Sequence, residues 1–295
     1  MHSFSTSHIT IDPVQLSILQ GKKITLEVLR LDKIHPLVSG NKWFKLKYYL
    51  EQARQNNNTI VTFGGAWSNH IVATAAACRH YGLMCIGIIR GEESPTPTPA
   101  LIQAKELGMQ FIFSSRADYA HKKIPEEFKQ KTYCIIPEGG YGILGVQGAA
   151  TIAEHYTAAG FSHICCAVGT GTMMAGLILA ATNRQTILGI SVLKNHFDLM
   201  DSIRHLTPGL QIQSSINHDY HFGGYARMNP ELIAFMNEFF RLTGIPSDFV
   251  YTGKLFYAVN DLLKKDYFPD GSKILLVHSG GLQGNASLPG GTLIF

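Results

Sequence analysis

Four short apolar runs, each closed by a glycine-bearing turn, constrain the fold of this chain most. They cover residues 60–63, 133–136, 164–168 and 274–277. A continuous apolar run is typical of a strand in a parallel sheet that is covered on both faces. Segments of helical composition follow the first three turns, at about residues 71–81, 145–159 and 173–182, so strand and helix alternate at the spacing of an α/β fold. In open α/β sheets, ligands bind at the carboxyl edge where such turns gather.

A lysine stands at the start of a further predicted helix. Lys42 follows a turn-prone run, and the spacing of Phe44, Leu46 and Tyr49 predicts an amphipathic helix to about residue 54. The helix macrodipole disfavours a cation at this end. A neutral, desolvated amine would remove the conflict, and a Schiff-base lysine requires such an amine. An ordinary exposed lysine is the alternative, and this stretch alone does not separate the two.

The turn after residues 164–168 has the composition of a phosphate-binding loop. It reads Gly169-Thr170-Gly171-Thr172 and leads into a predicted helix at residues 173–182. Glycines let backbone amides approach phosphate oxygens, threonine hydroxyls add donors, and a helix start favours negative charge. The turn is neither a Walker loop nor the G-x-G-x-x-G dinucleotide fingerprint, because position 174 is methionine. A purely structural turn is the alternative.

Composition excludes several classes of protein. Charged residues make up 16% of the chain, the formal net charge is +4, and no dense basic run occurs, so nucleic acid is not an expected partner. Residues 1–20 lack the pattern of a signal peptide, and no apolar run reaches the roughly 18–20 residues that span a bilayer. We therefore expect a cytoplasmic protein without a membrane partner. The five cysteines contain no C-x-x-C pair and are expected to be reduced core residues rather than disulfide partners or metal ligands.

Taken together, six ordered motifs resemble one enzyme family. They span nearly the whole chain, and their order is more specific than any one of them: Gly40-Asn41-Lys42-x-x-Lys45-Leu46, Gly64-Gly65-x-x-Ser68-Asn69-His70, Pro137-Glu138-Gly139-Gly140, Gly169-Thr170-Gly171-Thr172, Tyr251-Thr252-Gly253-Lys254 and His278-Ser279-Gly280-Gly281. The chain resembles pyridoxal-phosphate enzymes of the tryptophan-synthase-β type, fold type II. It is most similar to the branch that holds 1-aminocyclopropane-1-carboxylate (ACC) deaminase and D-cysteine desulfhydrase.

The resemblance implies a two-domain α/β fold with open, mostly parallel twisted sheets and helices on both faces. A large domain that binds pyridoxal 5'-phosphate would combine residues 1–44 and 148–295, and a small α/β domain would occupy residues 45–147. The active site would lie between the domains, and closure of the small domain on the substrate is the expected motion. A homodimer is expected from the family alone.

The resemblance also implies roles for the cofactor-binding residues. Lys42 would bond the cofactor and move protons at the substrate α-carbon, while Asn69 would hydrogen-bond the phenolic oxygen. Ser279 or Thr252 would face the pyridine nitrogen. Lys45 and the loop formed by Gly169, Thr170, Gly171 and Thr172 would hold the phosphate. No metal is implied.

The substrate would be a small amino acid. Its carboxylate would bind Ser68 and the amides around Asn69 and His70, and Ser68 could relay a proton. Tyr251, and with it Tyr225, would stand beside the cofactor and substrate. Structural alternatives are a helix cap for Ser68, a core aromatic for Tyr251 and an ordinary structural histidine for His70.

Thr252 guides the choice of reaction. ACC deaminase carries a glutamate here, and a carboxylate beside the pyridine nitrogen favours its protonation, as ring opening demands. A hydroxyl does this much less, so we expect β-elimination in the manner of D-cysteine desulfhydrase, which converts D-cysteine to pyruvate, ammonia and sulfide. ACC deamination, giving 2-oxobutyrate and ammonia, is one alternative. A non-catalytic carrier of the cofactor is another, although a carrier needs neither Ser68 nor Tyr251.

Overall fold

The structure, a computed structural model, describes residues 5–56, 59–124 and 133–295, and contains two sheets within them. The larger sheet has the strand order β1-β2-β10-β7-β8-β9. Only β1 pairs antiparallel; the other pairs are parallel. Its strands are β1 (Ile11–Pro13), β2 (Thr25–Arg30), β7 (His163–Val168), β8 (Thr186–Ser191), β9 (Ser214–Asn217) and β10 (Lys273–His278).

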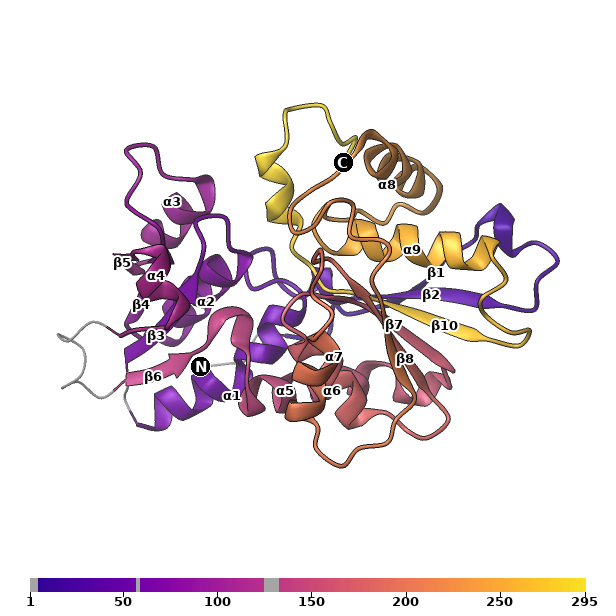
Figure 1. The fold of residues 1–295 in the computed structure, drawn as a ribbon, viewed down its shortest axis with the longest axis horizontal. Coiled ribbons are helices and arrows are strands. Elements are labelled where there is room, and N and C mark those ends of the chain that lie inside the picture. The colour runs from indigo at the N-terminus through magenta and orange to yellow at the C-terminus, as the bar shows by residue number, and fades with distance from the viewer. Residues whose placement is uncertain (1–4, 57–58, 125–132) are drawn as a thin grey trace.

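The smaller sheet lies beside the larger one in Figure 1 and has the order β5-β4-β3-β6. All its pairs are parallel. Its strands are β3 (Thr59–Gly64), β4 (Cys85–Arg90), β5 (Gln110–Ser114) and β6 (Tyr133–Ile136). These strands fall inside residues 45–147, the span expected for the small domain, whose boundaries stay a prediction.

Helices cover both faces of the larger sheet, which explains its continuous apolar strands. Neighbouring residues of a strand point to opposite faces. Cys166 accordingly packs in the cluster that contains α5 and α6, while Cys165 packs with α8 and α9. All five cysteines are buried and free. The helices are α1 (Asn41–Gln55), α2 (Asn69–Tyr81), α3 (Pro99–Glu106), α4 (Arg116–Ala120), α5 (Ile143–Ala150), α6 (Thr172–Ala180), α7 (Leu199–Leu206), α8 (Pro230–Thr243) and α9 (Thr252–Lys264).

The structure confirms the α/β class and corrects some elements. The sequence predicted one helix over residues 145–159, but α5 ends at Ala150 and two 3-10 segments follow, Thr151–His155 and Thr157–Ala159. The edge strands β1 and β9 and the short helix α4 were not predicted from the sequence. In the described residues, no helix is both long enough and apolar enough to cross a membrane.

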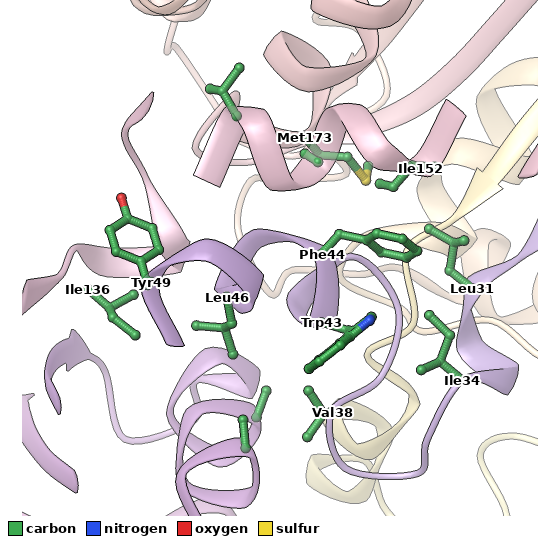
Figure 2. Close-up of a cluster of buried hydrophobic side chains, with 14 of the residues drawn as sticks. Leu31, Ile34, Val38, Trp43, Phe44, Leu46, Tyr49, Ile136, Ile152 and Met173 are labelled. Atoms are coloured by element: carbon green, nitrogen blue, oxygen red, sulfur yellow. The ribbon is translucent and has the colours of Figure 1, made fainter. Parts of the chain in front are cut away.

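Helix α1 joins the parts of the molecule and fixes the start of the lysine motif. It packs on α5 and also contacts α2 and β6 of the smaller sheet. Figure 2 shows Trp43, Phe44 and Leu46 leaving the first turns of α1 into a cluster with side chains of other elements, among them Val38 and Met173. Each of these side chains is almost completely buried. The residues that flank Lys42 are therefore held in the core.

The turn before α1 lies directly against the end of β10. Gly40 has a φ of +63°, and a Cβ there would lie 1.9 Å from the carbonyl oxygen of Ser279. That oxygen accepts a hydrogen bond from the amide of Asn41 at 3.2 Å. Only glycine permits this approach, so the first and last of the six motifs are joined through their backbones.

Candidate functional site

Lys42 is the second residue of α1, as the sequence predicts. Its ammonium donates a hydrogen bond to Oδ1 of Asn41 at 2.9 Å, and Asn41 in turn is placed by a 3.2 Å contact from Nδ2 to the sulfur of Met173. Desolvation lowers the pKa of Lys42 to about 8, against the opposing effect of the Asp248 carboxylate. An amine with such a pKa is available in its neutral, nucleophilic form near neutral pH.

Lys45 lies one turn further along α1 and is buried. Burial lowers its pKa well below the ordinary lysine value, and the charge of Lys42 adds to this effect. Within the described parts of the chain, no carboxylate forms an ion pair with either lysine. Two neighbouring buried amines without a carboxylate partner create a site that favours an anionic ligand.

The threonine-glycine loop lies near Lys45. A Cβ at Gly140 would be 3.1 Å from Cβ of Lys45, and one at the neighbouring Gly139 would be 3.0 Å from Cγ2 of Thr170. The Thr170 and Thr172 hydroxyls are 3.0 Å apart, and Thr172 is the first residue of α6. The loop, the start of α6 and Lys45 thus gather in one place, where backbone amides, hydroxyls and a cation could hold a phosphate.

Ser68 and Asn69 lie at the carboxyl end of β3, where α2 begins. Nδ2 of Asn69 donates to the carbonyl of Gly281 at 3.3 Å, which brings this turn to the C-terminal motif. Ser68 occupies the N-cap position of α2, but its side chain makes no capping hydrogen bond. The alternative role of Ser68, as a helix cap, therefore has no hydrogen bond to support it. Both side chains are partly exposed and could contact a ligand.

His70 is buried and bonds to the smaller sheet. Its Nε2 lies 2.8 Å from the hydroxyl of Thr62, which donates to the carbonyl of Ile136 at 2.8 Å. Because that hydroxyl has one proton, Nε2 must be the donor, and Nδ1 is left as an unprotonated acceptor. Nδ1 has no hydrogen-bond partner among the described residues. Burial lowers the pKa of His70 well below its ordinary value, and the charges of Lys45 and Lys42 add to it.

Two tyrosines stand beside Lys42. The ammonium of Lys42 is 5.8 Å from the ring centroid of Tyr251, and the Tyr225 ring meets that ring edge-on at 6.0 Å. Tyr251 also packs against the phosphate-type loop, because a Cβ at Gly169 would lie 3.1 Å from its Cε1. Burial, followed by the neighbouring Tyr225, raises the pKa of Tyr251 well above its ordinary value. Tyr251 is therefore a protonated phenol at neutral pH.

Thr252 and Ser279, the two candidates for the pyridine nitrogen, differ in their hydrogen bonds. The Thr252 hydroxyl donates to Oδ1 of Asp248 and accepts from the amide of Asp248, so its proton is committed. Thr252 is fully buried. The interactions described for Ser279 involve its backbone, since its carbonyl oxygen accepts from Asn41. The geometry therefore favours Ser279 as the hydroxyl that can donate to a ligand.

Two charged residues of the site were missed from the sequence. Asp248 and Lys254 frame the start of α9, where neither was assigned a role from the sequence, and both are fully buried. Lys254 donates to the carbonyls of His221 at 2.8 Å and Gly224 at 2.7 Å, beside Tyr225. The Tyr-Thr-Gly-Lys motif was the available signal, but it does not show burial. No group of three or more metal-ligating side chains occurs in the residues that the structure describes.

Comparisons with known proteins show which proteins this chain is similar to. Residues 14–280 match the family model described as pyridoxal-phosphate dependent enzyme. A protein of Pyrococcus abyssi named "Putative 1-aminocyclopropane-1-carboxylate deaminase" is 30% identical, over 84% of this chain and 81% of its own length. The mitochondrial bifunctional D-cysteine desulfhydrase/ACC deaminase of Arabidopsis thaliana is 29% identical, over 96% of this chain and 79% of its own. The crystal structure of an ACC deaminase homologue superposes with a TM-score of 0.81 at 26% identity, covering 97% of this chain and 92% of that one.

Proposed function

Since this chain belongs to the pyridoxal-phosphate dependent enzyme family, we propose that it catalyses β-elimination on a small amino acid, with D-cysteine as the substrate. The reaction would release pyruvate, ammonia and sulfide. The observation that carries the proposal is Lys42, whose ammonium has a pKa lowered to about 8 and lies 5.8 Å from the centre of the Tyr251 ring. A poised amine beside a protonated phenol is the pair of groups that proton transfer at the α-carbon requires.

The residues present fit the cofactor. Its phosphate would bind at the start of α6 with Lys45, whose buried amine has no ion pair with a carboxylate among the described residues. Asn69 would orient the ring oxygen, and Ser279 would face the pyridine nitrogen. When bound, the cofactor supplies an electron sink for the pair left at the α-carbon. The protein orients the substrate and moves the protons.

The substrate carboxylate would bind the turn of Ser68 and the amides that begin α2. These amides are unsatisfied within the helix and attract an anion. The neutral Lys42 amine would remove the α-proton. Tyr251, protonated at neutral pH, would assist the leaving group by donating a proton to it.

Elimination is favoured over ring opening because a hydroxyl, that of Ser279, would stand at the pyridine nitrogen. No carboxylate occupies that position, and the nearby Asp248 carboxylate accepts four hydrogen bonds from its own turn, from the Thr252 hydroxyl and three backbone amides. Both oxygens of this carboxylate therefore already accept hydrogen bonds from the protein. A hydroxyl at the pyridine nitrogen stabilises the protonated ring less than a carboxylate does, which suits a reaction with a good leaving group.

ACC deamination is the second candidate. The Pyrococcus abyssi relative carries that name, and the Arabidopsis thaliana relative is named for both activities. The same site could supply the lysine and the carboxylate-binding turn for either reaction.

A substrate panel separates these functions. The purified protein, loaded with pyridoxal phosphate, is mixed with D-cysteine, L-cysteine, D-serine or ACC, and pyruvate and 2-oxobutyrate are assayed with the visible absorbance of the cofactor. Pyruvate from D-cysteine supports the desulfhydrase, whereas 2-oxobutyrate from ACC replaces it by the deaminase. Cofactor absorbance without any keto acid would contradict both.

A further inference from the structure

A cationic hollow lies at the carboxyl edge of the smaller sheet, outside the residues assigned above. It has a volume of about 530 Å³ and is lined by Arg90, Arg116, Tyr119, Ala120, Lys122 and Glu138. Three of these side chains are cationic and one is anionic. Glu138 forms an ion pair with Lys122 at 2.6 Å. Within the described residues, no carboxylate forms an ion pair with Arg90 or Arg116, and both side chains are exposed.

Tyr119 lines the hollow beside two of its cations. The ammonium of Lys122 lies 3.7 Å from its ring centroid, and Cζ of Arg90 lies 5.9 Å from the same point. The Tyr119 hydroxyl is buried and makes no hydrogen bond of ordinary length and angle in the parts of the chain that the structure describes, although the Glu138 carboxylate lies close enough to act on it. Burial, followed by the nearby Glu138 carboxylate, raises the pKa of Tyr119, so the hydroxyl keeps its proton. A buried O–H beside several cations is suited to donate to an anion.

This hollow adjoins the proposed active site. Arg90 is the last residue of β4, next to the end of β3, and one of its guanidinium nitrogens would lie 3.6 Å from a Cβ at Gly65, in the turn that carries Ser68. Glu138 immediately precedes Gly139, which packs against Thr170 of the phosphate-type loop. The charges of Arg90 and Glu138 also act on the Tyr225 phenol. An amino acid whose carboxylate lies at Ser68 could therefore extend its side chain toward Arg90.

We propose that the hollow binds a negatively charged β-substituent, so that the enzyme acts on amino acids whose leaving group is an anion of the phosphate or sulfate class. The inference rests on the proposed elimination. With O-phosphoserine, the Cα–H and Cβ–O bonds break, and phosphate leaves with the electron pair of the Cβ–O bond. Water then completes the release of ammonia and pyruvate, so one O-phosphoserine and one water give pyruvate, ammonia and phosphate. Arginine is suited to hold such a group because its fork donates two parallel hydrogen bonds.

The test compares a substrate whose β-substituent is charged with one whose β-substituent is uncharged. Pyruvate formation from the two enantiomers of O-phosphoserine and of β-chloroalanine is measured for the wild-type holoenzyme and for Arg90→Gln, Arg116→Gln and Arg184→Gln. Arg184 is exposed and lies outside the hollow. We expect the kcat/KM ratio of O-phosphoserine to β-chloroalanine to fall about tenfold or more in the first two variants and to stay unchanged in the third.

A binding measurement gives a readout independent of turnover. Inorganic phosphate is titrated calorimetrically into the holoenzyme, whose cofactor occupies the phosphate-type loop. We expect binding that weakens about tenfold or more in the Arg90→Gln/Arg116→Gln double variant. Equal phosphate binding by both proteins, or an unchanged kcat/KM ratio, would overturn the proposal. Pyruvate from β-chloroalanine but not from O-phosphoserine would overturn it while leaving the elimination intact, whereas no pyruvate from either would reject the elimination itself.

Discussion

The hydroxyl of Thr252 and the carboxylate of Asp248 are joined by a 2.7 Å hydrogen bond at the start of α9. The same carboxylate accepts from the amides of Val250, Tyr251 and Thr252 at 2.8–2.9 Å. One buried side chain thus holds the backbone that carries Tyr251. The position of that phenol beside Lys42 depends on a residue that needs no contact with a substrate.

Replacing Asp248 by Asn tests this dependence. The amide nitrogen of asparagine cannot accept, so at least one buried N–H loses its partner, and we expect a loss of about 1–3 kcal/mol in the free energy of unfolding. Removal of the charge would also lower the pKa of Lys42 below about 8. Urea unfolding measures the first effect. The control is Asp201→Asn, at an exposed ion pair with Arg204, which should cost less than about 1 kcal/mol. Equal losses of unfolding free energy in Asp248→Asn and Asp201→Asn would contradict the role given to Asp248.

Lys254→Met addresses the segment that carries Tyr225. The variant leaves the carbonyls of His221 and Gly224 without their donor, at a cost of about 1–3 kcal/mol for each carbonyl that stays buried. We expect faster amide hydrogen exchange around Tyr225 and a raised KM. Lys264→Met, at the exposed end of the same helix, is the control. Unchanged exchange around Tyr225 would show that Lys254 does not order this segment.

These two residues also mark the limit of what the sequence could predict. The strands followed from apolar runs, and Lys42 followed from a cation at a helix start, because such patterns act locally. The sequence assigned no role to Asp248 or Lys254, because their burial depends on contacts with His221 and other residues distant in sequence. Strand β9 was missed because Ser214–Asn217 contains little apolar side chain. The helix predicted over 145–159 ended early, at Ala150, where 3-10 segments take over.

Gly40→Ala should be far more costly than a glycine substitution at another residue of positive φ, because Gly40 (ψ −140°) lies outside the αL region that Gly82 (ψ 28°) occupies and also faces Ser279. Gly82 has a φ of +66°, close to that of Gly40, but a Cβ there meets nothing within 4 Å. Gly82→Ala therefore measures backbone strain alone, about 1–2 kcal/mol. We expect Gly40→Ala to lower the melting temperature clearly more than Gly82→Ala does. It should also weaken cofactor binding through Lys42. Equal melting temperatures for the two variants would contradict the close contact with Ser279.

Lys42→Ala should abolish the visible absorbance that a lysine-bound cofactor gives. Loss of the group that moves the α-proton is expected to lower turnover by at least about 10²–10⁴-fold. Far-ultraviolet circular dichroism of the variant should match the wild type, because Trp43 and Phe44 still anchor the first turn of α1. Lys47→Ala, on the same helix, is the control. Retained absorbance in Lys42→Ala would assign the cofactor to another amine.

Stability should fall as pH decreases below about 6.5, in part because of His70. The folded-state pKa of His70 is well below its unfolded value of about 6.5, so the unfolded chain binds the proton first and stability is lost as pH falls. One such group contributes at most about 1.4 kcal/mol per pH unit. We expect His70→Gln to reduce the slope of unfolding free energy against pH between about 5 and 6.5. The exposed His205→Gln serves as control, and equal slopes for His70→Gln and wild type would refute the assignment.

The contact between Gly40 and Ser279 has a consequence for the order in which the chain folds during its synthesis. Strand β2 must pair with β10, and the lysine turn closes only on the end of β10. The smaller sheet, built from residues 59–136, is synthesised long before β10 leaves the ribosome. Pairing between such distant segments is slow, because the intervening chain must be ordered first. The nascent protein can therefore complete its smaller sheet early, but Lys42 reaches its folded surroundings only at a late stage of synthesis.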